Sequence, residues 1–163
     1  MKKQLAIAST LTFLAGSAVA QTAPDASKTP NASVLNAGSQ PATFGSPEYF
    51  TGQVRVEDRF ASTDPATVRG ATVVFEPGAR SAWHTHPLGQ ILIVTAGIGH
   101  VQVWDHSVQT IRPGDVVVIP AETKHWHGAS AENGMSHIAF SETLDGQSVT
   151  WLEQVSDEQY SAK

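Results

Sequence analysis

The sequence contains no cysteine, and this absence excludes several kinds of protein at once. A chain without thiols has no disulfide to stabilise it, no cysteine nucleophile and no thiolate metal ligand. Charged residues are also sparse, at 15% of 163 residues, and their formal net charge is −5. An acidic surface of this kind argues against nucleic acid or anionic lipid as a partner. Core packing must therefore stabilise the fold, and nitrogen or oxygen must bind any metal.

Long apolar runs are lacking too, except near the N-terminus. Residues 1–20 begin with Lys2 and Lys3, continue with an apolar stretch and end in the small-residue sequence AVA. This is the pattern of a secretory signal peptide, and its apolar part is shorter than the roughly 20 residues that span a membrane. We therefore expect cleavage before Gln21, export to the periplasm or the medium, and a mature protein that is not bound to a membrane.

The rest of the chain divides by composition. Residues 21–46 are rich in Ala, Ser, Thr, Asn and Pro, which predicts a flexible leader. Short β-prone runs follow at close spacing, separated by Gly and Pro: YFTGQVRV, GATVVFE, QILIVTAG, GHVQVWD, DVVVIPA, MSHIAFSE and SVTWLE. The pattern predicts one antiparallel all-β domain over residues 47–156, with a tail at 157–163. The sequence LEQVSDEQY predicts one short helix near the C-terminus.

Histidine occurs in two pairs, His84 with His86 and His125 with His127, each separated by one residue. Because successive side chains of a strand point to opposite faces, the two imidazoles of each pair point the same way. A further β-prone run supplies His137. Imidazole is the commonest metal ligand, so the pairs predict a metal site. Two other histidines lack a partner at this spacing and are expected at the surface: His100 and His106.

The histidines occur at the spacing of the two cupin motifs. The first motif, G-x5-H-x-H-x3-E-x6-G, is matched from Gly78 to Gly97, with Gln90 in place of glutamate. The second, G-x5-P-x-G-x2-H-x3-N, is matched from Gly114 to His125 and departs from it at two positions: Glu122 and Ala129. The chain thus resembles the cupins over residues 71–129. The resemblance implies a single-domain cupin, a double-stranded β-helix (jelly-roll) barrel with the metal inside.

Longer strings, among them FTGQVRV, GATVVFEPGARSAWHTHPLGQ and KHWHGA, are similar to the manganese-containing bacterial cupin hydroxynitrile lyases. The resemblance implies a lyase that cleaves and forms cyanohydrins from an aldehyde and cyanide. By position, it implies four metal ligands: His84, His86, Gln90 and His125. It implies three catalytic groups on the substrate side: His127, His137 and Ser81. It also implies three pocket residues: Ala71, Val73 and Ser141. Ser81 stands where that family can carry threonine, and Ser141 where it can carry a longer glutamine.

A neutral side chain at position 90 affects the chemistry expected of the ion. The amide oxygen of Gln90 coordinates as a neutral dipole, so three imidazoles and one amide leave the divalent charge uncompensated. The ion is then a stronger Lewis acid, which favours deprotonation of a bound hydroxyl without redox chemistry. Nitrogen and oxygen donors suit manganese or iron, and zinc or nickel could also occupy the site. We expect one divalent metal ion, with manganese the first candidate.

Two other functions are compatible with the sequence. The first is a metal-dependent cupin oxygenase, although neutral ligands make activation of dioxygen harder. The second is a non-catalytic periplasmic protein that holds a metal or small ligand in its barrel. His127 and His137 favour an enzyme, because they are titratable groups beyond a filled ligand set. We therefore expect a lyase with a small-molecule substrate. Cupins commonly assemble through their outer strands, so we also expect a homo-oligomer.

Overall fold

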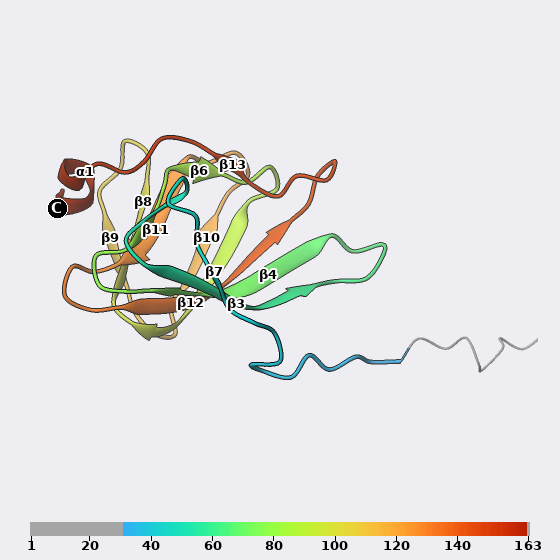
Figure 1. Cartoon of the computed structure of the whole chain (residues 1–163). Coiled ribbons are helices and arrows are strands. Elements are labelled where there is room, and N and C mark those ends of the chain that lie inside the picture. The colour runs from blue at the N-terminus through green and yellow to red at the C-terminus, as the bar shows by residue number, and fades with distance from the viewer. Residues whose placement is uncertain (1–30, 163) are drawn as a thin grey trace, which may run out of the picture. The chain divides into compact units, whose positions relative to one another are not determined.

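Short strands form nearly all the regular structure of residues 31–162, which are the residues that the computed structural model describes (Figure 1). The strands are β1 (Thr43–Phe44), β2 (Phe50–Thr51), β3 (Val54–Ala61), β4 (Val68–Phe75), β5 (Arg80–Ser81), β6 (His84–Thr85), β7 (Gln90–Gly97), β8 (Gly99–Val103), β9 (Gln109–Ile111), β10 (Val116–Ile119), β11 (His125–Ala129), β12 (Met135–Glu142) and β13 (Thr150–Trp151), and one helix follows, α1 (Asp157–Ser161). The predicted signal peptide lies outside the described residues. No helix within 31–162 is long and apolar enough to cross a membrane.

The strands form two curled antiparallel sheets that face each other (Figure 1). One sheet has the order β1-β3-β4-β12-β7-β10. The other has the order β13-β6-β11-β5-β2, and β8 joins it by pairing with β11 and β9. Sequence neighbours such as β12 and β13 lie in different sheets, which is the arrangement of a jelly-roll. The structure confirms the predicted all-β barrel with one short helix.

Apolar side chains pack in two places. The larger cluster fills the barrel between the sheets and includes Val54, Phe75 and Val94, all at most 2% exposed. The smaller one consists of Trp83, Trp126 and Val155 and packs against Tyr160. Trp83 directly precedes the first histidine pair, and Trp126 lies between the histidines of the second. Both tryptophans point away from the histidines, because side chains alternate along a strand. A buried tryptophan therefore packs on the side opposite each histidine pair.

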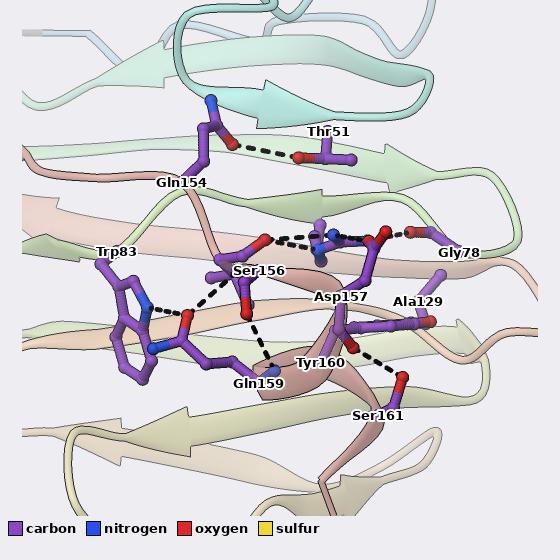
Figure 2. A network of polar contacts seen from close by, with 12 residues as sticks. Thr51, Gly78, Trp83, Ala129, Gln154, Ser156, Asp157, Gln159, Tyr160 and Ser161 are labelled. Atoms are coloured by element: carbon purple, nitrogen blue, oxygen red, sulfur yellow. Dashed lines mark hydrogen bonds and ion pairs between the residues drawn. The ribbon is translucent and has the colours of Figure 1, made fainter.

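The C-terminal segment packs on these tryptophans through Val155 and Tyr160, and Figure 2 shows its polar contacts with the barrel. The Trp83 Nε1–H group donates to Gln159 Oε1 at 3.2 Å, and the Tyr160 hydroxyl donates to the carbonyl of Ala129 at 2.8 Å. Arg80, which is 6% exposed, donates to Asp157 Oδ1 at 2.6 Å. The tail predicted at 157–163 is thus attached to the barrel over its described residues.

The helix is shorter than LEQVSDEQY predicts, because it begins only at Asp157. The Leu152 N–H group donates to the carbonyl of Trp83, and the Trp83 N–H group donates to the carbonyl of Glu153. These two bonds hold the preceding residues in an extended conformation against β6. Ser156 then caps the helix, since its side chain accepts from the Gln159 N–H group.

Part of the segment predicted as a leader belongs to the barrel. The compact unit of the barrel begins at Val34, and Thr43–Phe44 form β1 at the edge of the first sheet. The Gln40 side chain donates to the carbonyl of Arg59 at 2.7 Å, close to the same edge. An extended segment can add to an open sheet edge through its backbone alone, so a composition with few apolar residues did not reveal this strand.

Candidate metal centre

Two strands bring the histidine pairs together inside the barrel. His84 of β6 lies directly opposite His125 of β11, with ring centroids 4.2 Å apart. His127 is two residues further along β11 and faces the same way. The ligand atoms of His84, His125 and His127 all lie within 4.8 Å of one another. These three buried imidazoles could hold a metal ion.

Backbone carbonyls set the orientation of three imidazoles. The Nδ1 atoms of His84, His86 and His125 each contact a carbonyl oxygen, and the three oxygens belong to Ala82, Ser148 and Thr123. A carbonyl oxygen only accepts, so each Nδ1 carries the hydrogen and each Nε2 keeps a lone pair. Histidines that bind metals are typically held in this way, through the second ring nitrogen. The three imidazoles are therefore already oriented to bind a cation through Nε2.

The contact between Gln90 and His125 supports the same conclusion. Gln90 Oε1 lies 3.0 Å from His125 Nε2, and both atoms bear lone pairs when Nδ1 of His125 carries the hydrogen. Two lone pairs at this distance repel each other, and a cation held between them removes the repulsion. His86 Nε2 is buried and has no hydrogen-bond partner among residues 31–162. A buried atom of this kind is expected to bind a ligand, an ion or a water molecule.

Burial keeps these imidazoles neutral. Desolvation, helped by the neighbouring His125, lowers the pKa of His84 well below its ordinary value. Desolvation also lowers the pKa of His125 to about 4 and lowers that of His86. A metal binds the neutral form of histidine, so the site is ready to coordinate at neutral pH without losing protons.

His127 contacts another buried histidine, His137. His127 Nδ1 lies 3.1 Å from His137 Nε2, and the His127 N–H group donates to Ser81 Oγ at 3.2 Å. His127 Nε2 has no hydrogen-bond partner within the described part of the chain. When His137 donates, this Nε2 carries a hydrogen and can serve a substrate. When His127 donates, Nε2 has a lone pair and can join the metal ligands.

A cavity of about 150 Å³ adjoins these groups. Its lining comprises His84, His86, Gln90 and His127 with Phe50, Val73, Ala139, Ser148, Val149 and Trp151. Val73 therefore lies where the resemblance implies a pocket wall. Ala71 and Ser141 instead line a neighbouring cavity of about 760 Å³, which shares Ala139, Ser148 and Val149 with the first. Ser81 and His137 are fully buried, line neither cavity and contact the site through His127.

Sequence patterns did not identify every residue around the cavity. Trp151 of β13 pairs with His84, and their rings lie 4.9 Å apart. The run SVTWLE predicted a strand, but no local pattern shows which strand it pairs with. His100 is half-buried rather than at the surface, because Tyr160 of α1 lies over it with ring centroids 6.4 Å apart. His106 is exposed, as expected.

Comparison with known proteins identifies the family. The model of the cupin domain matches residues 71–138. The chain is 54% identical over 127 residues to an (R)-mandelonitrile lyase of Granulicella tundricola, an alignment that covers 78% of this chain and 97% of that one. A cupin-like protein of Thermotoga maritima superposes with a TM-score of 0.68 at 38% identity, over 79% of this chain and 95% of that chain. A polyketide cyclase of Streptomyces resistomycificus has the same fold, with a TM-score of 0.63 at 12% identity over 80% and 91% of the two chains. The barrel, its histidine pairs and these matches together show that the chain belongs to the cupin family.

Proposed function

We propose that this protein is a metal-dependent lyase that splits cyanohydrins into an aldehyde and cyanide and forms them in the reverse direction. The observation that supports this most strongly is its 54% identity to an (R)-mandelonitrile lyase over 97% of that protein. The small histidine-lined cavity agrees with it, because a reaction of this kind needs a Lewis acid and a proton carrier beside a compact substrate.

In this proposal His84, His86, Gln90 and His125 hold one divalent ion. His127 also lies close to His84 and His125, but we assign it to proton transfer because its Nδ1 contacts His137 instead of a backbone carbonyl. Manganese is the first candidate, and iron, zinc and nickel are the others, since the donors are nitrogen and oxygen only. When bound, the ion supplies Lewis acidity that makes a substrate hydroxyl easier to deprotonate. The neutral amide of Gln90 leaves that acidity undiminished. The carbonyl contacts at Nδ1 of the three histidines aim their Nε2 atoms before the ion arrives.

In this proposal His127 transfers the proton of the substrate hydroxyl. Its Nε2 atom is without a hydrogen-bond partner in residues 31–162, and its ring lines the cavity. We assign to it the exchange of a proton with the substrate hydroxyl or with the departing cyanide. His137 and Ser81 act through it rather than on the substrate, because His137 fixes the ring at Nδ1 and Ser81 holds the backbone N–H group. Val73 and Ala139 supply apolar walls that exclude water.

The decisive experiment measures benzaldehyde release from mandelonitrile under argon. The manganese-loaded protein should release benzaldehyde, and both the chelator-treated protein and His84→Ala should not. Replacement of His127 by alanine should lower the rate by roughly 10² to 10⁴-fold while the fold persists, which is the usual effect of losing a positioned acid or base. Absence of release under argon together with dioxygen uptake would establish an oxygenase instead. Absence of both reactions would indicate a binding protein.

We further propose that the partner of this chain is a second copy of itself, bound through the outer face of β7 and β10. Ile91, Val116 and Val118 are 42%, 58% and 70% exposed, and Val118 lies opposite Ile91 in the sheet. Contiguous exposed apolar side chains mark association surfaces. Light scattering coupled to gel filtration should give the mass of an oligomer. Val118→Glu should reduce that mass, and a monomeric wild-type protein would contradict the proposal.

We also propose that the protein is exported and loses residues 1–20. The pattern of Lys2 and Lys3, an apolar stretch and the terminal AVA supports this. The intact mass of protein recovered from a periplasmic extract should correspond to a chain beginning at Gln21. Recovery of the full-length chain from the cytoplasm alone would contradict export.

A further inference from the structure

The aromatic side chains at one wall of the cavity have no part in the chemistry described above. Trp151 and Phe50 both line the cavity, and their ring centroids lie 5.4 Å apart in an edge-to-face arrangement. Trp151 also stacks on Tyr49, with ring centroids 4.8 Å apart and an angle of 14° between the ring planes. The ring of Trp151 also lies 4.9 Å from that of His84. An aromatic surface therefore adjoins the candidate metal centre.

The backbone holds Trp151 rigidly in this place. Its strand pairs with β6, in the register Trp151 opposite His84. The next residue, Leu152, donates its N–H group to the carbonyl of Trp83, and Figure 2 shows the side-chain network that anchors the following segment to the barrel. A ring held by stacking and by strand pairing loses little further freedom when a ligand binds. Such preorganisation favours affinity.

The other lining residues restrict which ligand the wall can meet. Among residues 31–162, those lining the cavity include no Asp, Glu, Lys or Arg. Its volume of about 150 Å³ restricts it to small ligands. The cavity thus suits a small, uncharged molecule with an apolar end.

We propose that Trp151, together with Phe50, forms the subsite that selects a planar aryl group on the substrate over a saturated group of the same size. This inference rests on the proposed cyanohydrin lyase activity. The flat ring of the substrate packs against the aromatic wall while its hydroxyl carbon stays beside the histidines. Aromatic pairs gain about 0.5 to 1.5 kcal/mol beyond the burial of apolar area, which a saturated ring does not gain.

The test compares mandelonitrile with its cyclohexyl analogue, the cyanohydrin of cyclohexanecarbaldehyde, on the manganese-loaded protein. In Trp151→Leu the ratio of kcat/KM for the aryl over the cyclohexyl substrate should fall by about 2 to 12-fold, which corresponds to the energy of one aromatic pair. Phe50→Leu should lower the ratio in the same direction, and Trp151→Phe should keep most of it. The matched control is Trp104→Leu, because Trp104 is 39% exposed and lies outside the lining of the cavity.

A binding measurement separates this inference from the proposed function. Titration calorimetry with benzyl alcohol and cyclohexylmethanol should show tighter binding of benzyl alcohol by the wild type and loss of that preference in Trp151→Leu. If mandelonitrile is not cleaved but this preference is present, the lyase proposal fails and the aryl subsite stands. If mandelonitrile is cleaved and folded Trp151→Leu and Phe50→Leu both keep the wild-type ratio, the aryl subsite is refuted and the lyase proposal stands. Should Trp151→Leu not fold, Phe50→Leu alone decides.

Discussion

The buried His137 provides a quantitative test of how strongly the barrel couples stability to pH. Its side chain is fully buried, and desolvation lowers its pKa to about 4, whereas an unfolded chain has a value near 6.5. Between pH 6.5 and about 4 the unfolded state therefore binds a proton that the native state does not. The free energy of unfolding must fall as the pH falls through this window, and above it His137 contributes no pH dependence.

The magnitude follows from the size of the shift. Each unit of pKa corresponds to about 1.4 kcal/mol, so His137 alone removes about 1.4 kcal/mol of stability per pH unit within the window. Over the whole window this approaches about 3 kcal/mol, a substantial part of the 5 to 15 kcal/mol that stabilise a typical domain. His125, with a pKa also lowered to about 4, acts in the same direction.

The perturbation is His137→Gln, which keeps a side chain able to bond with His127 but does not titrate. Urea unfolding of the wild type and the variant should be measured from pH 7 to 4.5 in the presence of a chelator, so that metal release adds no pH dependence of its own. Below pH 6 the wild type should lose about 1 kcal/mol more per pH unit than the variant. His106→Gln, at an exposed position, should follow the wild type. Equal slopes for the wild type and His137→Gln would refute the reasoning, because His137 would then be protonated in the native state.

Three further predictions concern the metal ligands and the C-terminal contacts. His84→Ala should lose manganese and melt at a lower temperature, since metal at 100 times Kd stabilises the native state by about 2.7 kcal/mol. His127→Ala should keep the metal. Elemental analysis of both variants measures this, and equal loss of metal would place His127 among the ligands. Gln90→Glu should bind manganese as tightly or more tightly but cleave mandelonitrile more slowly, because a carboxylate offsets part of the charge of the ion, and unchanged turnover would contradict that role for ligand charge. Arg80→Met should lower the free energy of unfolding by about 2 kcal/mol, because the buried carbonyl of Val155 loses its donor. Asp157→Asn should lower it by less than about 1 kcal/mol, because that carboxylate is exposed, and urea melts that show equal losses would refute this difference.

Much of the fold and part of the site follow from local rules in the sequence. Alternation along a strand places His84 and His86 on one face and turns Trp83 to the other, whatever the partner strand is. The two tryptophans do lie on the opposite side, in a cluster of their own. Spacing also marks the strands and their turns, since Gly and Pro interrupt each β-prone run. These features depend only on neighbours within a few residues, so a single chain is enough to predict them.

Only the tertiary structure shows which strands meet and therefore which side chains share a cavity. The pairing of His84 with His125 joins residues 41 positions apart, and that of Trp151 with His84 joins residues 67 positions apart. The same long-range packing brings His127 within 4.8 Å of the other two histidines, while Ala71 lines a different cavity. A period of two specifies a face but not a partner, because the register between distant strands is set by how both sheets and the C-terminal segment pack together.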